Sequence, residues 1–507
     1  MFRKKLSTFN RQIDVKYKAS NKMDKDIKKL LPLDLWSYFH QLTQIPRPSK
    51  NEKKAIEYIS DFGKTNQLET HIDQTGNVII RKNASKGMEN RKGVILQAHL
   101  DMVPQKNSAK IHDFITDSIE AYIDGDWVTA NQTTLGADNG IGVSAILAIL
   151  ASKEIKHGPI EALFTVSEEI GMIGAFGLKP DLLKGEILLN LDSEDEGELY
   201  IGCAGGADTK VVINYKEEQA PASFKSFKIS IEGLNGGHSG LDIHLKRGNA
   251  NKMMNRLLIN ANQHLGLILA EINGGNIRNA IPRESHAIVA LPEKEVENFL
   301  KFSKEIEAYY KKTLIDDQNF NISIAEVEMP ANFIDAETVD NLLNAVHLCP
   351  NGVIKMSKDI QGIVETSSNL AILKTENGTI TISLFHRSSS DLAKKELCIQ
   401  IKELFTKYGG QVEQYGNSPG WKPNPNSPIL KIMKEVYQHN FGKTPEVKVI
   451  HAGLECGVLG AAYPHFDMIS FGPTIRFPHS PDEKVHIESV DKFYQFLLET
   501  LRNIPVK

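Results

Sequence analysis

Residues 23–205 alternate short apolar runs with longer helical patterns. The segments 93–103, 160–169 and 185–194 are rich in Val, Ile, Leu and Ala before they end in polar residues, which is typical of strands buried inside a sheet. The segment 140–153 is apolar over a greater length and predicts a buried helix. Short apolar strands separated by helices predict a mostly parallel α/β sheet.

The pattern changes between residues 206 and 416, where apolar and polar residues alternate in several segments. Such alternation is typical of strands with one solvated face, and helical patterns such as 249–265 fall between them. After residue 416 the alternation of helices and apolar strands returns. We therefore predict an α/β domain with a mixed, mostly parallel sheet flanked by helices, built from 23–205 and 417–507. An α+β domain, 206–416, is inserted into it.

Three further segments complete this outline. Residues 24–42 predict the first helix, and 120–130 predict a hairpin. Residues 1–22 are basic and polar and lack the apolar core of a secretory signal, so we expect a flexible extension there. A transit peptide is the alternative for this extension, although it contains few arginines.

The composition excludes several classes of protein. Of 507 residues, 41% are hydrophobic and 24% are charged, so the chain can bury cores for more than one domain. A formal net charge of −4 offers no basic field for nucleic acid. No apolar run reaches the roughly 18 residues of a membrane span. The four cysteines form no C-x-x-C pair, which fits a reducing, cytoplasmic compartment better than a disulfide framework.

Histidines and carboxylates collect at the ends of the predicted strands and in nearby loops. The residues concerned are His99 and Asp101, Asp138, Glu168 and Glu169, Asp192 and His479. Asp138 lies in the glycine-rich segment TTLGADNGIG, which opens the apolar helix, and His479 lies late in the chain in RFPHSPDEKVHI. Because ligands of open α/β sheets bind outside the carboxyl ends of the strands, we expect these side chains to meet at one rim.

Each of these residues, taken alone, has a structural explanation. A lone acid after a strand is most often a helix N-cap or a turn residue, and Asp138 could simply cap its helix. Taken together they favour a metal site, since the adjacent charges of Glu168 and Glu169 cost free energy unless a cation compensates them. Two histidines with several carboxylates suit zinc or a similar divalent ion. The acids are too many for one tetrahedral zinc, so two ions that share a carboxylate fit better.

Seven motifs stand out along the chain, namely AHLDMVP, TTLGADNGIG, TVSEEIGMIGA, LNLDSEDEGELYIGCAGG, GGHSGLDIH, NIRNAIPRE and FPHSPDEKVHI. Together they resemble one superfamily of enzymes, the co-catalytic zinc exopeptidases related to aminoacylase and glutamate carboxypeptidase. Within this superfamily the chain is most similar to the Xaa-His dipeptidase branch, and the late segment HAGLECG looks peculiar to that branch. The resemblance covers nearly all of the chain after Met23. It implies a catalytic domain at 23–205 and 417–507 and a lid domain at 206–416.

The resemblance assigns roles to the residues of the predicted metal site. One divalent ion would be bound by His99, Asp138 and Asp192, and the second by Asp138, Glu169 and His479, so that Asp138 bridges both. Asp101 would orient the His99 ring, and Glu168 would act as the general base. Zinc is the expected metal, with cobalt or manganese as alternatives.

In the lid domain the resemblance assigns three further residues. His238 would help to hold the developing oxyanion, Asn279 would contact the substrate, and Arg387 would bind its terminal carboxylate. His244 follows closely in the same stretch, so the choice of His238 rests on the register of the motif alone. Without the resemblance, His238 and Arg387 would be interpreted as a loop histidine and a solvated arginine.

The implied function is metal-dependent hydrolysis of the peptide bond of dipeptides, including Xaa-His and β-alanyl-histidine substrates, by a metal-bound water activated by Glu168. An N-acyl-amino-acid deacylase of the same superfamily is the nearest alternative. A non-catalytic binding protein on the same scaffold is an alternative from another class. The expected partner is a dipeptide, with no nucleic acid and no membrane, and a homodimer is compatible with the long lid.

Overall fold

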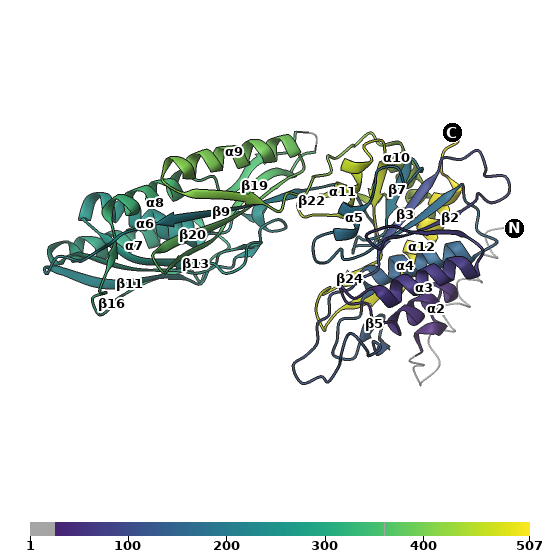
Figure 1. Ribbon diagram of the computed structural model, residues 1–507, viewed down its shortest axis with the longest axis horizontal. Helices are drawn as coiled ribbons and strands as arrows, with labels where there is room; N and C mark the ends of the chain where they lie inside the picture. Colours follow the sequence, from purple (N-terminus) through teal and green to yellow (C-terminus); the bar gives the residue numbers. More distant parts are fainter. Residues whose placement is uncertain (1–25, 359) are drawn as a thin grey trace. The chain divides into compact units, whose positions relative to one another are not determined.

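The computed structural model describes residues 26–358 and 360–507, which fold into two compact units (Figure 1). The first unit comprises the described residues up to Glu198 together with Lys431–Glu446 and Phe466–Lys507. The second comprises Leu199–Leu430 and Val447–His465. The extension predicted at 1–22 lies outside the described residues.

Two segments that we expected to fold with the first domain belong to the second unit, namely residues 417–430 and 447–465. Trp421 forms an antiparallel bridge with Cys203, and the carbonyls of Ile450 and Ala452 accept hydrogen bonds from the backbone N–H of Ala204. These contacts attach both segments to the chain that enters the second unit. The catalytic and lid roles of the two domains stay predictions.

A mixed sheet forms the centre of the first unit. Among the described residues, six of its strands lie wholly in this unit, in the order β1 (Glu69–Ile72), β2 (Val78–Lys82), β6 (Ile160–Thr165), β3 (Val94–His99), β7 (Ile187–Asn190) and β23 (Asp467–Ser470). The pairs β1–β2 and β2–β6 are antiparallel, whereas β6, β3, β7 and β23 run parallel. The predicted mixed, mostly parallel sheet is therefore confirmed. Two further strands, β8 (Glu198–Cys203) and β22 (Glu446–Ile450), contain the points at which the chain passes between the units.

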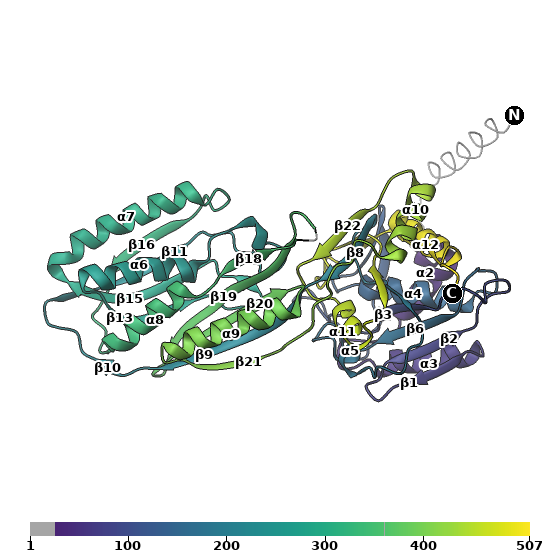
Figure 2. The ribbon, with the colours of Figure 1, turned by 90° about the horizontal axis from the view of Figure 1, so that it is seen from above.

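The parallel strands are enclosed on both faces, which explains why their sequences are apolar without alternation. Every residue of β3, β6 and β7 is buried. Helix α4 (Ala137–Ala151), itself buried along nearly its whole length, packs against β3 and against α2 (Leu33–Thr43). Helix α3 (Lys53–Thr65) packs on β1 and β2, and α12 (Ile487–Arg502) is the last helix of the unit (Figure 2).

The first predicted helix is interrupted by a proline. A continuous helix was expected over 24–42, but the structure has a 3-10 turn η1 (Ile27–Lys29) and then α2 from Leu33. Pro32 lies between them, and a proline disfavours the helical conformation in the residue before it and lacks the N–H that would bond to the preceding turn. The prediction was therefore wrong for the N-terminal half of this segment.

The hairpin predicted within 120–130 is confirmed. Its strands β4 (Ala121–Asp124) and β5 (Trp127–Ala130) are antiparallel, and β5 also pairs with β25 (Lys484–His486), which pairs with β24 (Ile475–Arg476). This small sheet therefore holds a late segment of the chain beside an early one. The loop between β24 and β25 carries His479.

An antiparallel sheet dominates the second unit. Its described strands follow the order β16 (Asn321–Glu326), β11 (Phe224–Glu232), β15 (Ser285–Pro292), β13 (Ile268–Gly274), β19 (Val364–Glu376), β20 (Thr379–Ser388), β9 (Gly205–Asn214) and β21 (Gln411–Tyr415), with β18 (Gly352–Met356) paired to β19. Helices α6 (Ala250–Leu265), α7 (Val296–Thr313), α8 (Ala336–Leu348) and α9 (Asp391–Lys407) contribute to one apolar core with this sheet (Figure 2). The α+β character predicted for this region is confirmed.

Shorter elements complete the described fold. The strands β10 (Glu217–Glu218) and β17 (Phe333–Ile334) pair with each other, as do β12 (Gly237–His238) and β14 (Ala280–Ile281). Further helical segments are α5 (Ile173–Gly177), α10 (Pro428–Phe441), α11 (Glu455–Ala462), η2 (Ile243–Leu245) and η3 (Glu293–Glu295).

Replacing Leu147 in α4 by alanine should lower the free energy of unfolding of the first unit by about 2–5 kcal/mol, because this fully buried side chain would leave a cavity. The matched Leu33→Ala change, at a position of α2 that is 54% exposed, should stay within about 0.5 kcal/mol of the parent. Denaturant unfolding followed by circular dichroism measures both. Equal losses for the two variants would contradict the enclosed position of α4.

Candidate metal centre

Neighbouring parallel strands deliver candidate ligands to one edge of the first unit's sheet. β3 ends at His99, the loop after β6 carries Glu168 and Glu169, and the loop after β7 carries Asp192. Asp138 stands at the start of α4 with a non-helical backbone, and His479 lies in the loop between β24 and β25. The fold therefore brings together all of the residues that were predicted as metal ligands.

Two groups of candidate ligands share Asp138. His99 Nε2 lies 3.0 Å from Asp138 Oδ1 and 3.2 Å from Asp192 Oδ1. His479 Nε2 lies 3.2 Å from Asp138 Oδ2 and 3.0 Å from Glu169 Oε2. The ligand atoms within each group lie within 4.8 Å of one another, close enough for one ion to contact them all. The two oxygens of Asp138 thus face two different groups.

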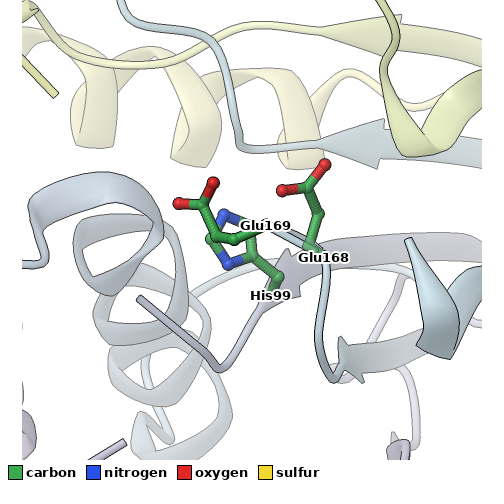
Figure 3. Close-up of side chains that lie close together, drawn as sticks. All are labelled: His99, Glu168 and Glu169. Atoms are coloured by element: carbon green, nitrogen blue, oxygen red, sulfur yellow. The ribbon is translucent and has the colours of Figure 1, made fainter. Parts of the chain in front are cut away.

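A third group contains Glu168 (Figure 3). His99, Glu168 and Glu169 also offer one ligand atom each within 4.8 Å of one another. In Figure 3 the carboxylates of Glu168 and Glu169 point in the same general direction. The acid predicted as the general base therefore lies close to the ligands. From this position it could act on a molecule bound among them or contact a cation itself.

Asp101 has a larger structural role than the sequence predicted. It is fully buried, and its carboxylate accepts hydrogen bonds from the backbone N–H of Glu168 at 2.9 Å and of Glu169 at 3.2 Å, and from Ser49 Oγ at 2.8 Å. Its Oδ1 lies 3.4 Å from His99 Nδ1, which is also 3.1 Å from the Asp101 carbonyl. Asp101 therefore fixes the Glu168–Glu169 loop as well as facing the imidazole.

The electrostatics of the cluster reflect an excess of buried negative charge. Burial alone would lower the pKa of His99, but Asp192, Asp101 and Asp138 outweigh burial and raise that pKa well above its ordinary value. Hydrogen bonds to Asp138 and Glu169 raise the pKa of His479 to about 11. Burial raises the pKa of Asp192 well above its usual range, with His99 acting in the opposite direction. A divalent cation in place of the imidazole protons would compensate the same charge.

The hydrogen bonding of the carboxylates also fits a metal. Among the described residues, Glu169 Oε1 is a buried oxygen with no hydrogen-bond donor, and the nearest ring nitrogen to the buried Asp192 Oδ1 is His99 Nε2 at 3.2 Å, outside good hydrogen-bond geometry. Such atoms are costly unless a cation or a donor satisfies them. Imidazole nitrogen and carboxylate oxygen are ligands that zinc and similar divalent ions accept. The residues present are therefore suited to hold divalent metal ions.

Two buried charged residues that were not predicted surround the start of α4. The carboxylate of Glu483 accepts hydrogen bonds from four successive backbone N–H groups, those of Leu135, Gly136, Ala137 and Asp138. Arg47 donates to the carbonyls of Leu100, Asp101 and Gly136. Burial raises the pKa of Glu483 to about 7, although its backbone donors oppose this shift, and burial lowers the pKa of Arg47 to about 10.

These contacts rule out the alternative explanation that Asp138 caps the N-terminus of its own helix. Its carboxylate does not cap its own helix but faces His99 and His479, and Glu483 binds the N–H groups instead. Glu483 follows His479 by four residues within the motif HSPDE, so inspection of the motif's neighbours could have found it. No comparable signal marks Arg47.

Backbone strain coincides with the loops of the candidate ligands. Ser167, Phe477 and His479 have φ values of 52°, 54° and 59°, in the left-handed region that non-glycine residues rarely adopt. Each such position costs on the order of 1–3 kcal/mol, and such positions cluster at functional sites. Ser167 is anchored by its hydroxyl, which donates to Glu52 Oε1 at 2.6 Å. The strain thus lies in the loops that present Glu169 and His479.

The residues predicted for the lid lie in the second unit around a buried arginine. The β12–β14 pair places His238 opposite Ala280, which follows Asn279. Arg387 is 6% exposed, and its Nη2 lies 3.2 Å from His238 Nε2. His244 is exposed and sits on η2, so His238 is the histidine that contacts the arginine.

Arg387 carries a buried charge for which the described residues show no carboxylate ion pair. The nearby Asp208 pairs with Arg278 at 2.9 Å, and the guanidinium groups of Arg278 and Arg387 both lie over the ring of Phe385. The Nε of Arg387 is buried without a hydrogen-bond partner. Burial and Arg278 lower the pKa of Arg387 to about 10, which leaves it charged at neutral pH. Burial and Arg387 lower the pKa of His238 to about 4, which leaves its ring neutral.

One further histidine of the second unit faces this cluster. His451, from the segment HAGLECG, is buried and contacts Ser367 Oγ through Nε2 at 2.8 Å. Burial, Arg387 and His238 lower the pKa of His451 to about 3.

In the part of the chain that the structure describes, no helix is both long and apolar enough to cross a membrane.

Comparison with known proteins gives concordant results. Residues 95–503 match the model of Peptidase family M20/M25/M40. The cytosol non-specific dipeptidase of Escherichia coli (strain K12) is 44% identical over 483 residues, which cover 95% of this chain and 100% of that protein. The crystal structure of aminoacylhistidine dipeptidase from Vibrio alginolyticus is 45% identical, with a TM-score of 0.91 over 96% of this chain and 100% of that one.

A more distant structure shows the fold alone. The aminopeptidase PepT from Bacillus cereus ATCC 10987 is 16% identical and has a TM-score of 0.61 over 94% of this chain and 99% of that chain. The family match extends from β3 to α12 and so includes every candidate ligand. The predicted resemblance to metal-dependent exopeptidases is thereby confirmed at the level of the family. This chain belongs to Peptidase family M20/M25/M40, and it is a hydrolase of peptide bonds.

Proposed function

We propose that this protein is a metal-dependent dipeptidase whose substrates include Xaa-His and β-alanyl-histidine dipeptides. The observation that carries the proposal is the pair of ligand groups joined by Asp138, with Glu168 beside them. Two similar proteins named cytosol non-specific dipeptidase and aminoacylhistidine dipeptidase support this substrate class. The first of these names also supports a cytoplasmic location.

In this proposal His99, Asp138 and Asp192 hold one divalent ion, and Asp138, Glu169 and His479 hold the other. Zinc is the proposed metal, with cobalt or manganese as alternatives. When bound, such ions polarise the scissile carbonyl and lower the pKa of water toward about 7. Asp101 keeps the Glu168–Glu169 loop in place and faces His99 Nδ1, so that Nε2 of this ring is directed toward Asp138.

Glu168 is the proposed general base. It would accept a proton from the attacking water and pass it to the leaving amine. Its backbone is fixed by the hydrogen bond to Asp101, and its carboxylate lies in one group with His99 and Glu169. Both observations support a role in which Glu168 acts on a molecule that the ligand groups hold.

Arg387 and His238 are the proposed binding groups for the anionic parts of the substrate, with Asn279 as a further contact. The N–H groups of Gly240 and Leu241 point at His238 Nδ1, and Arg387 Nη2 points at His238 Nε2 at 3.2 Å. Among the described residues the buried Nε of Arg387 has no hydrogen-bond partner, so the guanidinium keeps a donor for a bound acceptor. A carboxylate or an oxyanion is the acceptor that a guanidinium suits.

Removal of metal should abolish hydrolysis, because no other described group of the first unit would supply the Lewis acid of the proposed reaction. Chelated protein should regain activity toward β-alanyl-histidine and ordinary dipeptides when zinc, manganese or cobalt is added. Hydrolysis of N-acyl amino acids in preference to dipeptides would identify a deacylase instead. Failure to bind any divalent ion in a calorimetric titration would support a non-catalytic binding protein.

The Glu168→Gln variant should retain both metal ions and lose about 10²–10⁴-fold in kcat, because the amide cannot accept the proton. Steady-state kinetics and metal analysis of the purified variant measure the two effects separately. Glu154→Gln, at an exposed position of the same unit, is the matched control and should behave as the parent. Loss of metal together with activity would identify Glu168 as a ligand rather than the base.

The Arg387→Ala variant should lower kcat/KM for dipeptides with a free carboxylate by about 10- to 100-fold, the cost of losing hydrogen bonds to a charged group. The amidated form of the same dipeptide should change little on this substitution, because it offers no carboxylate. Arg256→Ala is the control, since this arginine of the second unit stacks on Tyr309 and Tyr310. An equal loss for the acid and the amide would remove Arg387 from the carboxylate-binding role.

A further inference from the structure

The loop that presents Asp138 is held through its backbone by a single carboxylate. Glu483 Oε2 accepts from the N–H of Leu135 at 2.8 Å and of Gly136 at 2.9 Å. Its Oε1 accepts from the N–H of Ala137 at 2.8 Å and of Asp138 at 3.3 Å. A carboxylate has about four acceptor positions, so these donors use its full capacity. Because Glu483 is only 2% exposed, solvent does not compete for them.

The same residue also fixes the loop that presents His479. Glu483 lies four residues after His479 and directly before β25, and its backbone N–H donates to the carbonyl of Ser480. Its own carbonyl accepts from Thr129 Oγ1 at 2.8 Å, on strand β5. One residue therefore couples the segments that supply Asp138 and His479, which belong to the same ligand group.

Arg47 holds the opposite side of the Asp138 loop. Its Nη2 donates to the Gly136 carbonyl at 2.5 Å, and its Nη1 donates to the carbonyls of Leu100 at 2.9 Å and Asp101 at 3.0 Å, just beyond β3. A Cβ on Gly136, whose φ is 71°, would lie 2.6 Å from Arg47 Nη2, and one on Gly140 would lie 2.8 Å from it. The glycines of TTLGADNGIG therefore permit the close approach of the guanidinium. The loop is held at its N–H groups by an anion and at a carbonyl by a cation.

From these contacts we propose that Glu483 is a positioning residue of the metal centre, which sets Asp138 relative to His479 and thereby the affinity for the ion that they share with Glu169. The inference rests on the proposed function for the assignment of these ligands. Residues that orient metal ligands typically change metal affinity by about 10–100-fold when they are replaced. Glu483 uses all its acceptor positions on the backbone, so its influence on the ion passes through Asp138.

The Glu483→Gln variant tests this inference, because the amide keeps the shape but turns one acceptor into a donor that faces backbone N–H groups. Metal-free wild-type protein titrated with Zn²⁺ in a calorimeter should bind two ions. The folded variant should bind the ion of the group Asp138, Glu169 and His479 about 10–100-fold more weakly, and the ion of the other group, which shares Asp138 but not His479, should lose less affinity. Glu483→Asp, which keeps the carboxylate, should recover part of this loss. Glu488→Gln on α12, whose side chain is 68% exposed, is the control and should match the wild type.

The outcomes separate this inference from the proposed function. Two wild-type affinities in a folded Glu483→Gln protein would overturn the role of Glu483 and leave the dipeptidase proposal intact. A wild-type protein that binds no Zn²⁺ would overturn the proposed function instead. If the variant does not fold, amide hydrogen exchange of the wild-type protein tests whether Glu483 holds the backbone of Leu135–Asp138. The N–H groups of Leu135–Asp138 should exchange as slowly as those of β3, and fast exchange would overturn the inference.

Discussion

Several carboxylates lie close together at one end of a buried parallel sheet, and other contacts of the first unit hold their loops in place against the repulsion between them. These acids divide into two kinds by the way in which their charge is satisfied. Asp101 and Glu483 are surrounded by backbone N–H groups and hold the loops in place. Asp138, Glu169 and Asp192 face the two imidazoles. The first kind holds the loops in place against the repulsion between the like charges of the second kind.

Much of this arrangement follows from the sequence by simple rules. Strands that are enclosed on both faces must be apolar throughout, so their positions and their polar ends are visible, and parallel strands place those ends at one edge. The residues that eluded prediction act through three-dimensional backbone geometry. The N–H groups that Glu483 binds belong to residues almost 350 positions earlier in the chain, with separations from 345 to 348. A pattern along the sequence carries no information about such a partner.

In the second unit, too, contacts between distant segments were not visible in the sequence. Alternating strands and amphipathic helices predicted its α+β character, but not that residues 417–430 and 447–465 fold with it, because a strand's sequence does not specify its neighbour. The interruption of the first helix at Pro32 is a different case. The effect of a proline on the helix is local, so the sequence alone could have predicted it. The candidate site residues of the two units also differ in charge. Several carboxylates gather in the first unit, and the second contains the buried Arg387, for which the described residues show no carboxylate ion pair.

The small sheet that joins β5 to β25 has a consequence for how the protein is made. His479 lies 341 residues after Asp138, and the whole second unit is synthesised between them. During translation the residues of the first ligand group, His99, Asp138 and Asp192, leave the ribosome long before the second group is complete. The nascent first unit therefore carries one group of candidate ligands while the inserted unit folds, and the later segment that contains β24 and β25 completes the other group. Assembly of the second candidate group therefore requires a segment that is synthesised after the whole second unit.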